Sequence, residues 1–106
     1  MQTIVYDKLV RDRIPEIIKS SGKTCITETL SEKDYLWMLD KKMVEELVEY
    51  YKDHSIEELA DLMEVVYAAV IARGFTIEEL ESIRKKKAEE RGKFEKRILL
   101  KEVCEE

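Results

Sequence analysis

The chain has 106 residues, of which 44% are hydrophobic and 41% are charged, and its formal net charge is −5. The hydrophobic fraction excludes a disordered chain, and the length suits one small domain covering residues 1–106. The negative net charge argues against general nucleic-acid binding, and the longest uncharged run, residues 65–72, is too short to span a bilayer.

The first predicted helix is short. Pro15 suits a first helical turn because its missing N–H would be unpaired there, and Gly22 ends the pattern, so we expect a helix over residues 15–21. The segment Thr24–Leu30 is rich in β-branched residues and favours a short strand. Near the end of the chain, Phe94–Val103 favours a second strand beside the first.

Three longer helices are predicted from their first residues. Each begins with a pair typical of a helix N-cap, namely Ser31 with Asp34, Ser55 with Glu58, and Thr76 with Glu79. The predicted helices cover residues 32–52, 56–73 and 77–91. Because helices joined by a short turn must lie side by side, we predict a mainly all-α fold, an antiparallel helical bundle with a possible short two-stranded β element.

Residues 45–61 carry seven carboxylates, opposed only by Lys52. Glu46 and Glu49 are three residues apart on one predicted helix, and Glu58 and Asp61 are three apart on the next, so each pair shares a helix face. Enclosed carboxylates need a compensating charge, and their oxygens are the ligands that Mg²⁺ and Mn²⁺ prefer. These four residues are therefore candidate metal ligands. The alternative is that they are exposed acids on charge-rich helices.

Other side chains are candidates for handling water, phosphates and a base. Glu45, beside the metal ligands, would orient or deprotonate a water. Lys87 and Arg91 lie one helical turn apart and would bind a leaving pyrophosphate, although basic residues at a helix C-terminus also favour the helix dipole. The remaining candidates for substrate binding are Lys8, Arg11, Arg13 and Trp37.

The acidic segments resemble a known signature. "EELVE" (45–49) followed by "EELAD" (57–61) is similar to the EExxE…ExxD pattern of the all-α NTP pyrophosphohydrolase superfamily, which includes MazG, dimeric dUTPases and phosphoribosyl-ATP pyrophosphohydrolase. The flanks "YDKLVRDRIPEII" (6–18) and "RKKKAEERGKF" (84–94) look like the ends of the small, single-domain MazG-like members described as house-cleaning enzymes. The resemblance covers nearly the whole chain.

The resemblance implies a function and a site. Glu46, Glu49, Glu58 and Asp61 would hold Mg²⁺, for which Mn²⁺ can substitute, and Glu45 would be the leading acid of the motif. A nucleoside triphosphate, standard or non-standard, would be hydrolysed to the monophosphate and pyrophosphate by attack between the α and β phosphorus. The short connection between the acidic segments argues against a built-in loop that recognises the base.

Two other functions remain open at this point. The first is a noncatalytic helical module whose acidic seam binds metal or a basic partner. The second is a pyrophosphohydrolase of the same fold that hydrolyses another phosphoanhydride, such as phosphoribosyl-ATP. We expect a homo-oligomer, dimer or tetramer, because residues 65–72 are apolar on every face. We also expect a soluble, cytoplasmic protein. In that compartment two free thiols are the simpler interpretation of Cys25 and Cys104, in preference to a disulfide.

Overall fold

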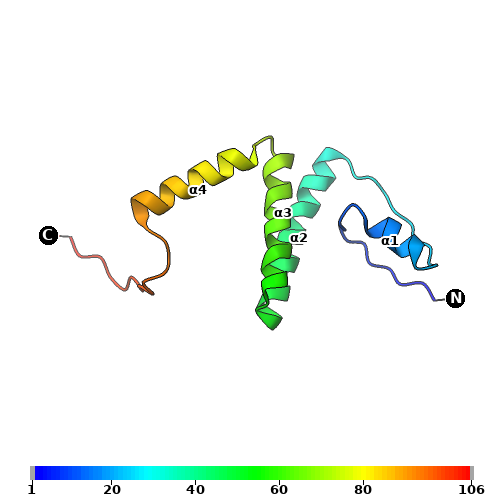
Figure 1. The fold of residues 1–106 in the computed structure, drawn as a ribbon, viewed down its shortest axis with the longest axis horizontal. Helices are drawn as coiled ribbons and strands as arrows, with labels where there is room; N and C mark the ends of the chain where they lie inside the picture. The colour runs from blue at the N-terminus through cyan, green and yellow to red at the C-terminus, as the bar shows by residue number, and fades with distance from the viewer. Residues whose placement is uncertain (1, 106) are drawn as a thin grey trace.

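The computed structural model describes residues 2–105, and over this range it contains four α-helices and no strand. They are α1 (Ile14–Ser20), α2 (Glu32–Asp53), α3 (Ile56–Ala72) and α4 (Ile77–Arg91). Helices α2 and α3 form an antiparallel hairpin at the centre of the molecule, with α1 on one side and α4 extending away on the other (Figure 1). The prediction of a mainly all-α protein is confirmed.

The helix boundaries follow the predicted caps. The side-chain oxygens of Ser31, Ser55 and Thr76 accept the backbone N–H groups of Asp34, Glu58 and Glu79, at 3.2, 3.3 and 3.0 Å. Each bond satisfies one of the amides that a helix N-terminus leaves unpaired. Between α2 and α3, His54 adopts a left-handed conformation with φ of 55°, which ends α2 and lets the chain reverse within two residues.

We expect Ser31→Ala to lower the free energy of unfolding by about 1 kcal/mol, since the backbone N–H of Asp34 would lose its acceptor. Urea denaturation followed by circular dichroism measures this change. Ser82→Ala is the matched control, because Ser82 is exposed inside α4 and caps no helix. An equal loss of stability in both variants would contradict a capping role for Ser31.

The two predicted strands are wrong. Thr24–Leu30 and Phe94–Val103 form no ladder in the structure. β-Branched residues favour a strand only when a neighbouring strand completes its hydrogen bonds. Here the two segments lie on opposite sides of the hairpin (Figure 1), in a molecule that measures 70 × 32 × 22 Å along its principal axes. The two segments therefore do not pair with each other as neighbouring strands.

The core of the hairpin is thin. Among the described residues only Leu39 of α2 and Val65 of α3 are buried, with 3% and 9% of their surfaces exposed. Helix α4 contacts α3 near the connection between them, whereas α1 makes no such helix–helix contact. In residues 2–105, none of the helices combines the length and apolar character that crossing a membrane requires. Cys25 and Cys104 are both free thiols.

Candidate metal centre

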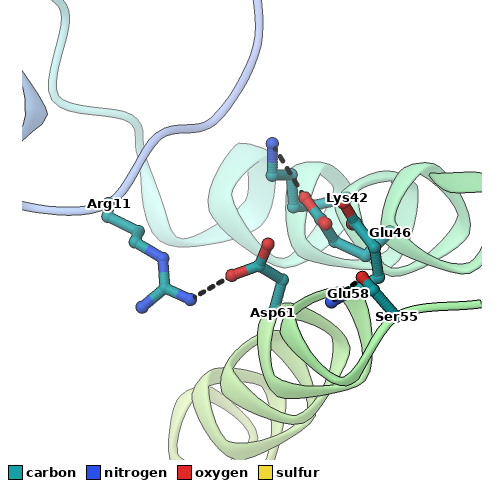
Figure 2. Close-up of polar contacts among 6 residues, drawn as sticks. All are labelled: Arg11, Lys42, Glu46, Ser55, Glu58 and Asp61. Atoms are coloured by element: carbon teal, nitrogen blue, oxygen red, sulfur yellow. Dashed lines mark hydrogen bonds and ion pairs between the residues drawn. The ribbon is translucent and has the colours of Figure 1, made fainter. Parts of the chain in front are cut away.

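Three carboxylates from two helices meet at the seam of the hairpin. Glu46 comes from α2, and Glu58 and Asp61 come from α3 (Figure 2). One oxygen from each lies within 4.8 Å of the others, and all three residues are half-buried. The helical repeat explains this convergence, because Glu46 follows the buried Leu39 by seven residues and Glu58 precedes the buried Val65 by seven.

The donor set suits a hard divalent cation. Carboxylate oxygens are the ligands of Mg²⁺ and Mn²⁺, and no sulfur or imidazole belongs to the group that Glu46, Glu58 and Asp61 form. Oxygens bound to one Mg²⁺ lie about 2.1 Å from it, so two of them are at most about 4.2 Å apart. The observed spacing therefore requires only a small inward movement of the side chains.

Two basic residues already neutralise part of this charge. Arg11 Nη2 donates to Asp61 Oδ1 at 2.7 Å, and Lys42 Nζ lies 3.4 Å from Glu46 Oε1 and 3.3 Å from Glu45 Oε2 (Figure 2 shows the pairs of Asp61 and Glu46). Lys42 is the more enclosed cation, with 18% of its side chain exposed. Arg11 is held in the turn before α1, where its carbonyl accepts the N–H of Ile14 at 3.1 Å.

The cap of α3 leaves the Glu58 carboxylate free. At the start of α4, Glu79 Oε1 accepts the N–H of Thr76 at 3.2 Å and closes the capping box. At the start of α3, the corresponding N–H of Ser55 donates instead to Asp53 Oδ1 at 2.9 Å. In a capping box Glu58 would accept this N–H. Asp53 accepts it instead, and the Glu58 side chain joins the acidic cluster.

The electrostatics of the cluster act on Glu58. Burial, followed by the negative charges of Asp53, Asp61, Glu46 and Glu49, raises the pKa of its carboxyl above the ordinary value. Protonation of Glu58 is thus more favourable in the folded protein than in the unfolded chain. This contribution to stability is fully present below the pKa of the unfolded chain and is lost as the pH rises through the raised pKa.

Glu58→Gln should therefore raise the thermal midpoint of the metal-free protein at neutral pH and weaken its decline as the pH rises above the ordinary pKa of a glutamate. The amide keeps the shape of the side chain but adds no charge to the cluster. Thermal melts across this pH range, in the presence of a chelator, measure the effect. Glu57→Gln is the control, because Glu57 is exposed and lies outside the cluster. If Glu58→Gln lowered the thermal midpoint and Glu57→Gln did not, repulsion among the carboxylates of the cluster would be contradicted.

The other predicted metal ligand and the predicted water-binding acid lie beside the cluster. Glu49 is half-exposed and lies 3.4 Å from Lys52 Nζ, and its carboxylate is not one of the three that converge. Glu45 is paired with Lys42. The structure therefore brings together Glu46, Glu58 and Asp61, with Glu45 next to them through the shared lysine.

Most of the predicted cationic and aromatic candidates lie elsewhere. Lys87 and Arg91 belong to α4, which leaves the hairpin at the end opposite the His54 turn (Figure 1). Trp37 is exposed and lines a hollow with Asp40 and Arg73. The other two candidates have local partners: Lys8 Nζ lies 5.5 Å from the ring centroid of Tyr6, and Arg13 Nε lies 3.5 Å from Glu16 Oε2.

Sequence reasoning missed Lys42 and the role of Asp53. Lys42 precedes Glu45 by three residues and Glu46 by four, which is the spacing of helical ion pairs. That spacing was a usable signal. The competition between Asp53 and Glu58 for one amide was not readable, because both residues suit a cap in the sequence.

Comparison with known proteins identifies no family. One relative is a Mycolicibacterium smegmatis protein described as uncharacterized, to which the chain is 52% identical over 42 residues. The match covers 40% of this chain and 43% of the relative, so the chain spans less than half of that protein's length. No family model matches the chain. No solved structure matches it either.

Proposed function

We propose that this chain is a Mg²⁺-dependent nucleoside triphosphate pyrophosphohydrolase of the MazG-like type. The observation that carries the proposal is the convergence of Glu46, Glu58 and Asp61, from two helices, on one half-buried point flanked by Arg11 and Lys42. A solvated acidic surface would not need its acids at the seam of the hairpin. Phosphoryl chemistry requires both a carboxylate-held metal and nearby cations.

In this proposal Glu46, Glu58 and Asp61 hold the metal, which when bound supplies positive charge to the phosphates and to a water. Glu49 follows Glu46 by three residues on α2, and it would have to release Lys52 to become a further ligand. Glu45 accepts the proton of the attacking water. The water oxygen forms a bond to the α phosphorus as the bond from that phosphorus to the bridging oxygen breaks, and the electron pair leaves with the departing pyrophosphate.

Arg11 and Lys42 bind phosphate oxygens. Both cations pair with carboxylates of the site, so metal binding would free them to turn to the substrate. The planar guanidinium of Arg11 can donate two parallel hydrogen bonds to a phosphate, whereas Lys42 offers a compact charge. Because Arg11 and Lys42 contact the carboxylates of the site, we assign phosphate binding to them rather than to Lys87 and Arg91.

An open hollow on the hairpin suits the nucleoside. Tyr35, Tyr67, Ala68 and Ile71 are among its lining residues. Ala68 follows Asp61 by seven residues along α3, which places it on the same side of the helix and about 10 Å from Asp61. Aromatic rings stack on bases of any sequence. These tyrosines therefore replace Trp37 as the aromatic candidates for contact with a base.

The test is release of pyrophosphate from a panel of standard, deoxy and modified nucleoside triphosphates, with phosphoribosyl-ATP included, in the presence and absence of Mg²⁺. We expect metal-dependent release from at least one nucleoside triphosphate. Release from phosphoribosyl-ATP alone would keep the chemistry and change the substrate. Tight Mn²⁺ binding without any release would favour a noncatalytic metal-binding module instead.

A further inference from the structure

Glu64 of α3 is an acid that the metal centre does not use. It lies three residues after Asp61, on the same face of the helix, but its carboxylate does not belong to the group that Glu46, Glu58 and Asp61 form. Its side chain lines the hollow in which Tyr35 and Tyr67 lie. Glu64 therefore stands between the metal centre and the hollow that the proposed function assigns to the nucleoside.

The Glu64 carboxylate is open to a ligand. Ion pairs engage five other acids of α2 and α3, namely Asp40, Glu45, Glu46, Glu49 and Asp61. None of the ion pairs within residues 2–105 involves Glu64, and the residue is exposed. An ionised carboxylate only accepts hydrogen bonds, and it has two oxygens that can each receive a donor. A ligand group that faces Glu64 must therefore present donors.

The order of residues along α3 matches the order of groups in a nucleotide. Asp61 belongs to the metal centre, Glu64 lies about 4.5 Å further along the helix axis, and Ala68 lies about 10 Å beyond Asp61. Tyr67 lines the hollow together with Ala68. Because the sugar joins the phosphates to the base, a nucleotide with its phosphates at Asp61 and its base against Tyr67 places its sugar at Glu64.

The charge of Glu64 opposes the reverse orientation. A triphosphate lying along the hollow would bring negative charge against the carboxylate, and like charges repel each other. The two cations of the site, Arg11 and Lys42, contact Asp61 and Glu46 rather than Glu64. The phosphates are therefore drawn toward these cations, and the uncharged part of the nucleotide faces Glu64.

We propose that Glu64 accepts hydrogen bonds from the 2′- and 3′-hydroxyls of a ribose, so that ribonucleoside triphosphates are the preferred substrates of the site. Two neighbouring hydroxyls present two donors to the two carboxylate oxygens, whereas a 2′-deoxyribose presents one. Carboxylates bind the ribose 2′-hydroxyl of NAD in dinucleotide-binding folds by the same chemistry. This inference rests on the proposed function, because the metal centre fixes where the phosphates lie.

Binding of nucleotides that cannot be cleaved tests the inference apart from catalysis. The probes are α,β-methylene triphosphates of adenosine, guanosine, cytidine and uridine and their 2′-deoxy forms, titrated calorimetrically into the full chain with Mg²⁺. Loss of one hydrogen bond to a charged group should weaken binding of the deoxy form by about tenfold. Equal affinities of the two sugar forms for every base would overturn the proposal, as would the absence of binding.

Glu64→Ala should make the two sugar forms bind equally. Alanine favours a helix and Glu64 is exposed, so α3 should keep its structure. Glu57→Ala is the matched control, because Glu57 is an exposed glutamate of the same helix outside the hollow, and it should keep the preference for ribose. A preference that survived Glu64→Ala would overturn the proposal. Loss of Mn²⁺ binding in Glu64→Ala without nucleotide would also overturn it, by making Glu64 a metal ligand.

Pyrophosphate release separates a failure of this inference from a failure of the proposed function. Release from ribonucleotides and deoxyribonucleotides with equal kcat/KM would remove the role of Glu64 and keep the proposed function. Tighter binding of the ribonucleotide analogues without any release would keep the role of Glu64 and remove the proposed function.

Discussion

Asp61→Asn should abolish Mg²⁺-dependent pyrophosphate release and leave the helix content unchanged. The amide keeps the shape of the side chain, but it removes the negative charge that a metal needs and that Arg11 contacts at 2.7 Å. Loss of a group that only supports a metal ligand costs about 10–100-fold in metal affinity or activity. A direct ligand should cost at least as much. Isothermal titration with Mn²⁺ and the pyrophosphate assay measure the two effects on one preparation.

Glu57→Gln is the matched control for this variant. It makes the same change of charge on α3, four residues earlier and outside the converging carboxylates. We expect it to keep both metal binding and turnover. If Asp61→Asn were fully active and still required metal, Asp61 would not be a ligand. Equal losses in the two variants would point to the general charge of the helix instead.

The second large effect is expected at Arg11. If its guanidinium stabilises the charge that develops on the phosphates, Arg11→Ala should raise the activation free energy for kcat/KM by about 2–4 kcal/mol. Most of this loss should appear in kcat. Its ion pair with Asp61 is more than one-third exposed, so its loss should cost little stability. Steady-state kinetics and the thermal midpoint, measured on the same sample, separate the two contributions.

Arg91→Ala is the comparison that decides between the two basic groups. Arg91 lies in the last turn of α4, where a cation stabilises a helix by about 0.3–1 kcal/mol. We therefore expect a slightly lower thermal midpoint and an unchanged kcat. The reverse pattern, with kcat lost in Arg91→Ala and kept in Arg11→Ala, would assign the phosphates to α4. That helix would then have to approach the acidic cluster from a second copy.

The helices were predictable because their determinants are local. Ser31, Ser55 and Thr76 act within one turn of their own positions, and the glycines after α1 and α4 end those helices without help from the rest of the chain. A strand at Thr24–Leu30 depends on a distant partner, which the sequence could not place. The directions of α1 and α4 were unreadable for the same reason, because few contacts fix them.

The acidic cluster was predictable in part. Spacing indicated that Glu58 and Asp61 share a face of α3, and they do converge with Glu46. The same rule paired Glu46 with Glu49, but only Glu46 lies one heptad, seven residues, after the buried Leu39 of α2, so only it reaches the seam. Which member of an acidic pair faces a neighbouring helix depends on the packing of Leu39 and Val65, which the spacing of charges does not record.

The long, thin outline of the molecule affects how its mass must be measured. Its radius of gyration is 18.9 Å, whereas a compact chain of this length has about 13 Å. Drag in solution grows with the length of a particle, so one extended copy would leave a gel-filtration column early, at the volume of a heavier sphere. Elution volume would thus report a dimer whether or not one existed. Only methods that weigh the particle, such as light scattering or sedimentation equilibrium, distinguish a rod-like single chain from a shorter, thicker pair.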